Sequence, residues 1–249
     1  MKRSAHAVAS AFRYFSVLPF GRASESAPPD SYAIVMLPLV GACIGAASGA
    51  AGWCIARWAA EPWPALGAFA AMVLLTGAIH IDGFLDCCDG VLASVPPRRR
   101  LEILKDPRHG TYAVVGMVLL ALFWVAALQS IPPARLLLAL ALSGALARLS
   151  AVPLLRLFRY AYAETASRNI ESPAEIAAFV LLTIGTALLA AMPSPWALLL
   201  VPAAGVLAIA IAWGCARRLD GSVTGDVYGA AIVLVELALL VAIALLPWR

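Results

Sequence analysis

Charged side chains are scarce in this sequence. Only 13% of its 249 residues are Asp, Glu, Lys or Arg, whereas 63% are hydrophobic and the mean hydropathy is +0.90. So few charges cannot cover the surface of a water-soluble domain of this length, and the net charge of +4 does not indicate a nucleic-acid partner. We therefore expect an integral membrane protein whose partner is the lipid bilayer, with no nucleic acid bound.

Several sequence signatures are also missing. The five cysteines form no Cys-x-x-Cys pair, which argues against a disulfide framework or a zinc site. P-loop and kinase motifs are absent. No segment alternates like a strand of a membrane barrel, so the parts that cross the bilayer should be helices.

Seven apolar runs approach the ~20 residues needed to cross a bilayer. They predict spans at 34–56, 64–80, 112–130, 134–155, 174–192, 196–214 and 226–247. We expect the second helix to continue through the following acidic stretch to about Ala93. The fold class is therefore all-α: one polytopic transmembrane domain over 1–249, with a helical bundle at 34–249.

The segment before the first span has a different pattern. Within 1–33, residues 3–16 place Val8, Phe12 and Phe15 at helical spacing beside basic side chains. This predicts an amphipathic helix on the cytoplasmic membrane surface. The first span then carries Gly41, Gly45 and Gly49 at four-residue intervals, which favours close helix packing.

Lys and Arg are distributed unevenly between the predicted loops. If the N-terminus is cytoplasmic, fourteen of the 18 basic residues lie on that side, three on the other, and Arg148 inside a span. Because short cytoplasmic loops are enriched in Lys and Arg, we expect a multi-pass protein of the bacterial inner membrane with a cytoplasmic N-terminus and site.

The most informative stretch is His80-Ile81-Asp82-Gly83-Phe84-Leu85-Asp86-Cys87-Cys88-Asp89-Gly90. In a helix, Asp82, Asp86 and Asp89 fall within about 60° of one another. Three carboxylates on one face repel unless a cation lies between them, and such ligands suit Mg²⁺ or Mn²⁺. The sequence therefore predicts a metal site, with a solvated acidic helix end as the alternative. Gly83 and Gly90 leave a flank where a ligand or a helix can approach closely.

Other polar residues are candidates for substrate contacts. Lys105, Asp106, Arg108 and the neighbouring His109 suit phosphate groups, and His80 is either a substrate contact or a packed histidine. Arg148 lies inside a span, where it needs an anion or water.

Two residues open the last predicted span. Thr224 and Asp226 either cap this helix or belong to the site. We expect Arg148 and Asp226 to share a pocket with the acidic stretch. The structural alternative is a pair between Arg148 and either Asp226 or Glu236.

These motifs together resemble the cobalamin synthase family, the adenosylcobinamide-GDP ribazoletransferases. The resemblance rests on Phe15-x-Val17-Leu18-Pro19, Pro38-Leu39-Val40-Gly41, the acidic stretch, Lys105-Asp106-x-Arg108-x-Gly110-Thr111-Tyr112, Arg148, and Thr224-Gly225-Asp226-x-x-Gly229-Ala230. The sequence departs from the family in Tyr160–Ser167, where a YARPEG-like stretch is expected. A more distant likeness, Asp86-x-x-Asp89-Gly90-x-x-Ala93, is similar to the start of the CDP-alcohol phosphotransferase motif.

The resemblance implies transfer of phosphocobinamide from adenosylcobinamide-GDP to the ribose hydroxyl of α-ribazole or its 5′-phosphate, with release of GMP. It further implies Mg²⁺ with Asp82, Asp86 and Asp89 as metal ligands and catalytic residues. The expected substrate-binding residues are His80, Gly83, Gly90, Lys105, Asp106, Arg108, Arg148, Thr224 and Asp226. A homodimer is compatible with this assignment. The alternatives are a CDP-alcohol phosphotransferase acting on a lipid alcohol, and a cation transporter.

Overall fold

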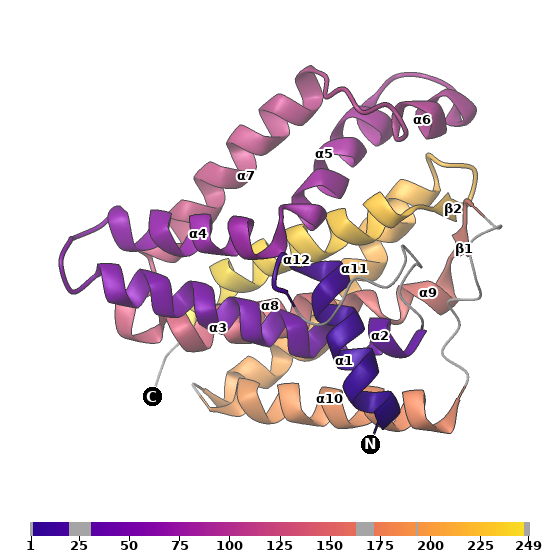
Figure 1. Cartoon of the computed structure of the whole chain (residues 1–249). Helices are drawn as coiled ribbons and strands as arrows, with labels where there is room; N and C mark the ends of the chain where they lie inside the picture. Colours follow the sequence, from indigo (N-terminus) through magenta and orange to yellow (C-terminus); the bar gives the residue numbers. More distant parts are fainter. Residues whose placement is uncertain (1, 20–30, 163–171, 193, 247–249) are drawn as a thin grey trace.

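The computed structural model describes residues 2–19, 31–162, 172–192 and 194–246, and it is almost entirely helical (Figure 1). Its helices are α1 (Lys2–Phe15), α2 (Ser31–Val35), α3 (Leu37–Ile55), α4 (Trp63–Thr76), α5 (Ile79–Leu92), α6 (Pro97–Ile103), α7 (Thr111–Gln129), α8 (Leu136–Ala151), α9 (Leu154–Leu157), α10 (Pro173–Ala191), α11 (Leu200–Ala216) and α12 (Gly225–Leu245). Two short 3₁₀ helices, η1 (Pro133–Arg135) and η2 (Pro195–Leu199), precede α8 and α11.

The membrane spans agree closely with the sequence prediction. Six helical stretches of the described residues are long and apolar enough to cross a bilayer: Leu37–Ile55, Thr111–Gln129, Pro133–Leu157, Pro173–Ala191, Pro195–Ala216 and Gly225–Leu245. The pair formed by α4 and α5 makes a seventh if it is counted as one broken span. The prediction of an all-α polytopic membrane protein is therefore confirmed.

The helix over the second span differs from the prediction. A single helix continuing to about Ala93 is wrong, because α4 ends at Thr76 and α5 leaves it at 91°. Gly77 and Ala78 both have positive φ, 59° and 57°, a left-handed conformation that interrupts a right-handed helix. The acidic stretch therefore lies on its own helix, turned away from the apolar segment before it.

The predicted glycine face of the first span packs as expected. A Cβ at Gly41 or Gly45 would overlap the backbone carbonyl oxygens of Gly144 and Leu140, so α3 and α8 touch through their backbones. Helix α8 is buried from Ala139 to Ala151 and forms the centre of the bundle. Close backbone approach of this kind is the way in which membrane helices gain dispersion energy.

The N-terminal segment forms the predicted helix, α1. Its buried side chains include Ala7, Ala11 and Phe12, which pack in one cluster with residues of α2 and α3. Part of its apolar face is therefore covered by the protein itself. The amide N–H of Val17 donates a hydrogen bond to the carbonyl of Leu75, which fixes the following segment to the break between α4 and α5.

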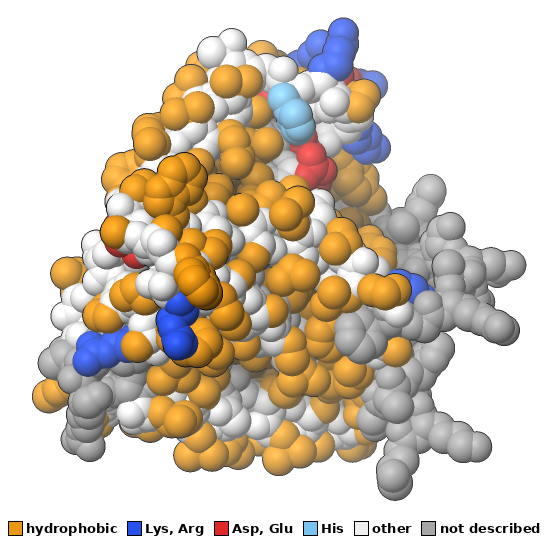
Figure 2. Space-filling model, turned by 60° about the vertical axis from the view of Figure 1, so that its left-hand side comes forward, with side chains coloured by type: hydrophobic (Ala, Val, Ile, Leu, Met, Phe, Trp, Pro, Cys, Tyr) orange, Lys and Arg blue, Asp and Glu red, His pale blue; other side chains and the backbone are white. Residues whose placement is uncertain are grey.

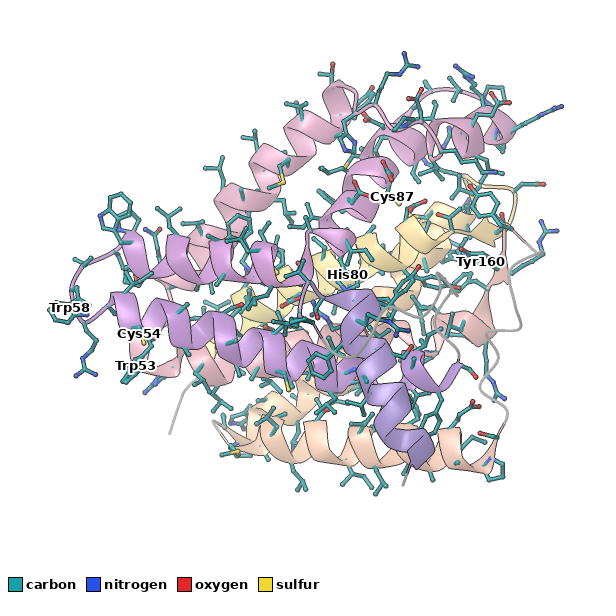
Figure 3. The ribbon with its side chains drawn as sticks, viewed as in Figure 1. Trp53, Cys54, Trp58, His80, Cys87 and Tyr160 are labelled. Atoms are coloured by element: carbon teal, nitrogen blue, oxygen red, sulfur yellow. The ribbon has the colours of Figure 1, made fainter. Side chains whose placement is uncertain are left out.

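The described residues also include one pair of short strands. Strands β1 (Arg159–Tyr160) and β2 (Ser222–Val223) pair in parallel, with Arg159 opposite Ser222. They lie with α6 at one end of the molecule, opposite the turn between α3 and α4 (Figure 1). That opposite end carries Trp53 and Trp58 (Figure 3), as expected of aromatic side chains at a membrane boundary.

Candidate active site

Two of the three predicted acids meet a histidine from another segment. His109 follows α6, and its Nε2 lies 3.7 Å from Asp82 Oδ1 while its Nδ1 lies 3.7 Å from Asp86 Oδ1. One potential ligand atom from each residue lies within 4.8 Å of the others. Figure 2 shows histidine and acidic side chains side by side on a mostly hydrophobic surface. Two carboxylates and an imidazole form a donor set that a divalent cation can use.

Asp89 has a different position from Asp82 and Asp86. Its Oδ1 accepts a hydrogen bond from the amide N–H of Ala113 at 3.0 Å, and its Oδ2 accepts one from Gly110. Gly110 directly precedes α7 and Ala113 lies in its first turn, where N–H groups have no partner within the helix. Asp89 therefore fastens α7 to α5, and its carboxylate is not part of the cluster formed by Asp82, Asp86 and His109.

Asp226 reaches the acidic helix because α5 and α12 are in backbone contact. A Cβ at Gly83 would lie 2.9 Å from Asp226 Cα, and one at Gly229 would lie 3.1 Å from the carbonyl oxygen of His80. The hydroxyl of Thr224 donates a hydrogen bond to Asp226 Oδ2 at 3.0 Å instead of capping α12. The two glycines thus bring Thr224 and Asp226 beside the acids of α5.

A cavity of about 230 Å³ opens between α1, α5 and α12. Asp82 and Asp226 both line it, as do His80 and Gly83. His80 lies at the start of α5 in the middle of the molecule (Figure 3), with 6% of its surface exposed. The structure therefore brings four of the predicted site residues together around one cavity.

The basic loop after α6 lies outside this cavity. Arg108 donates hydrogen bonds to both carboxylate oxygens of Asp106, at 2.9 and 2.8 Å. These bonds, with one from the Arg108 amide, hold the pKa of Asp106 at about 2. The Nζ of Lys105 lies 4.2 Å from the centre of the Tyr162 ring. The three residues form an exposed group next to His109 in the chain.

Gly90 and Arg148 make contacts within the protein. A Cβ at Gly90 would lie 2.7 Å from Leu104 Cγ, so this glycine admits the segment after α6. Arg148 Nη1 donates to Glu236 Oε2 at 2.7 Å, and both side chains are only 2% exposed. The structure thus shows the structural alternative for Arg148, a pair with Glu236. Arg148 does not line the cavity, whereas Asp226 does.

Two residues of this candidate site, His109 and Tyr160, were not identified as such from the sequence. His109 was counted among the phosphate-binding cations, and no spacing signal connects it to Asp82. Tyr160, at the start of the atypical loop, lines the cavity, and its ring stacks on that of Tyr228 with centroids 6.3 Å apart. Most of that loop, 163–171, lies outside the described residues.

Comparison with known proteins agrees with the motifs in the sequence. The profile of the family described as "CobS: Cobalamin-5-phosphate synthase" matches residues 7–244. Three bacterial proteins named "Adenosylcobinamide-GDP ribazoletransferase" are similar over most of their length. The one from Azorhizobium caulinodans is 37% identical over 95% of this chain and 94% of its own. The one from Klebsiella pneumoniae is 33% identical over 94% and 97%, and the one from Citrobacter koseri 36% identical over 86% and 87%.

No solved structure matches this chain. The family match covers the helix carrying Asp82 and Asp86, the loop with His109 and the start of α12. It therefore includes every element that forms the site. This chain belongs to the cobalamin synthase family of membrane enzymes.

Proposed function

We propose that this chain transfers phosphocobinamide from adenosylcobinamide-GDP to the ribose hydroxyl of α-ribazole, or of its 5′-phosphate, with release of GMP. The observation that carries this proposal is the meeting of Asp82, Asp86 and His109 beside a cavity that Asp82 shares with Asp226. Phosphoryl transfer needs such an arrangement, because the attacking hydroxyl and the phosphate must be held in line. The names of the three bacterial relatives support the identity of the two substrates.

Asp82, Asp86 and His109 would hold the divalent cation, which we propose to be Mg²⁺ or Mn²⁺. The fit rests on the donor set and on the 4.8 Å within which one atom of each residue lies. When bound, the cation neutralises charge that develops on the phosphoryl oxygens. The exposed carboxylate of Asp82 also faces the cavity, so it connects the cation site with the acceptor.

We propose that Asp226 accepts the proton of the attacking hydroxyl. It lines the cavity with Asp82, and the hydrogen bond from Thr224 fixes its orientation. A carboxylate within hydrogen-bond reach of the nucleophile can act as a general base. Lys105 and Arg108, in the segment that also carries His109, would supply positive charge for the GMP part of the donor.

The site should open to the cytoplasm. The acidic cluster joins α5 to His109, which follows α6 in the chain. Helix α6 itself carries Arg98, Arg99 and Arg100. Basic loops stay on the cytoplasmic side of bacterial membranes. Cysteine substituted at Ser94 should therefore resist an impermeant reagent added to intact cells, and rapid external labelling would contradict this orientation.

The activity is tested with purified protein in lipid nanodiscs, supplied with Mg²⁺ and α-ribazole. GMP should appear with adenosylcobinamide-GDP, and no CMP should appear with a CDP-activated lipid alcohol. Release of CMP alone would favour the CDP-alcohol class, and release of neither would contradict the proposal.

The role of the cation is tested separately by chelation. EDTA should abolish turnover, and Mg²⁺ or Mn²⁺ should restore it. His109→Gln should raise the Mg²⁺ concentration needed for half-maximal turnover by about tenfold. Arg99→Ala is the matched control, since Arg99 pairs with exposed Glu102 and not with the cluster. Equal Mg²⁺ requirements in the two variants would remove His109 from the site.

A further inference from the structure

The cavity between α1, α5 and α12 has a chemical character of its own. Most of its lining side chains are apolar or aromatic, among them Phe15, Ile34, Leu37, Tyr160, Tyr228 and Ile232. Its volume of about 230 Å³ is small compared with typical ligand pockets. It therefore suits one compact, largely apolar ring system and excludes a group as large as a corrinoid.

Charge restricts the ligand further. The charged side chains among the lining residues are Asp82 and Asp226, and none of the lining residues is Lys or Arg. A diphosphate inside the cavity would find no cationic side chain among these residues and would depend on the bound metal ion alone. An uncharged ligand whose hydroxyl points to the carboxylates is not repelled. Of the two proposed substrates, only the nucleoside acceptor has an uncharged ring system close to the hydroxyl that reacts.

His80 is a buried polar residue in the lining of this cavity. It is 6% exposed and lines the cavity, and its Nε2 has no hydrogen-bond partner among the described residues. One flank of the imidazole is covered by the Phe15 ring, with centroids 6.1 Å apart. Because an unpaired buried polar atom is unfavourable, this nitrogen indicates a ligand that completes its hydrogen bonding.

We propose that this cavity binds the base of the nucleoside acceptor and that His80 determines which base is accepted. The inference rests on the proposed function and names the acceptor's subsite. A fused-ring aromatic base lies among the apolar side chains, and His80 Nε2–H donates to its free ring nitrogen. The ribose then lies toward Asp82 and Asp226, which face the attacking hydroxyl.

A benzimidazole-like base matches this lining. It has one free ring-nitrogen acceptor, and His80 Nε2 is a buried lining atom that has no hydrogen-bond partner among the described residues.

The test compares the α-ribosides of benzimidazole and of indole as acceptors. The two have the same shape, but indole replaces the ring nitrogen by C–H. Wild-type protein should prefer benzimidazole riboside by about tenfold or more in kcat/KM, the effect of one lost hydrogen bond to a buried partner. His80→Phe should lower this ratio to about one, with the KM for adenosylcobinamide-GDP unchanged. His80→Gln, which keeps an N–H donor, should retain part of the preference.

A second variant probes the cavity without changing the imidazole. Ile34→Trp fills the space with a large ring, so it should raise the KM for both ribosides about tenfold and leave that for the donor unchanged. This variant decides the matter if His80→Phe does not fold. A tenfold preference that survives in His80→Phe, or a donor KM that rises in Ile34→Trp, would overturn this inference but leave the proposed function standing. If wild-type protein released no GMP with any acceptor, the proposed function would fail as well.

Discussion

The two sets of ionisable side chains in this protein differ in how their charge is balanced. Arg148 and Glu236 lie deep in the bundle at 2% exposure each, and their opposite charges meet at 2.7 Å. Asp82 and Asp86 lie on α5 with side chains 65% and 18% exposed, and His109 approaches each of them only to 3.7 Å. The charges of the buried pair balance each other within the protein, whereas the acidic cluster has negative charge in excess.

This difference indicates separate roles for the two sets. An unpaired charge inside the bilayer is costly, so the role of an ion pair inside a span is to let the chain fold with both charges neutralised. A cluster with excess charge at an accessible position is suited to a charged ligand that arrives later. Charge in the sequence pointed to both sets of side chains, and the presence or absence of a partner within the protein distinguishes them.

The largest effect on activity is expected from the cluster. Asp86→Asn removes one negative charge and one cation ligand, so turnover should fall about a thousandfold while the melting temperature stays within a few degrees. GMP release and thermal unfolding in nanodiscs measure the two quantities. Glu102→Gln is the control, since this exposed acid pairs with Arg99 instead. Turnover near that of wild type would contradict a catalytic cluster.

The opposite behaviour is expected of the buried pair. Arg148→Ala leaves Glu236 buried without its partner, which should destabilise the fold by about 3–5 kcal/mol. The double change Arg148→Met with Glu236→Leu removes both charges and should recover most of this stability. Unfolding in detergent checks both variants. A stable Arg148→Ala protein with a raised KM for adenosylcobinamide-GDP would instead support Arg148 as a substrate contact.

A smaller effect on activity is expected at Asp89. Asp89→Asn keeps one oxygen to accept a hydrogen bond from the start of α7 but loses the charge that favours this helix end. Turnover should fall by about tenfold or less, and the Mg²⁺ requirement should not change. A loss as large as that of Asp86→Asn would place Asp89 among the cation ligands.

The smallest effect is expected at Asp106. Its pKa of about 2 lies below its ordinary value of 3.8, because Arg108 donates hydrogen bonds to the charged form. The stabilising effect of this contact is therefore present above about pH 4 and is lost as the pH falls toward 2. Between pH 5 and 9 the carboxylate stays ionised, so Asp106→Asn should leave the pH at half-maximal kcat/KM unchanged. A shift of the acid limb in this variant would place Asp106 in the reaction.

The sequence by itself determined the membrane class and the spans other than the second, which is broken between α4 and α5. Long apolar runs have no alternative to helices in a bilayer, so their positions follow from composition alone. It also determined that Asp82 and Asp86 share a face, because an i, i+4 relation depends only on local helix geometry. The glycine face of α3 was recognisable for the same reason, since its four-residue spacing lies within one helix.

Only the tertiary structure decided how these parts meet. The break at Gly77 and Ala78 depends on two left-handed residues, and only one of them is a glycine. The pair between Arg148 and Glu236 joins residues 88 positions apart, and Asp89 reaches the N-terminus of another helix. Such contacts depend on which helix faces pack together, and no local periodicity contains that information. Tertiary packing also separates the three carboxylates of one helix face: Asp82 and Asp86 meet His109, whereas Asp89 accepts hydrogen bonds at the start of α7.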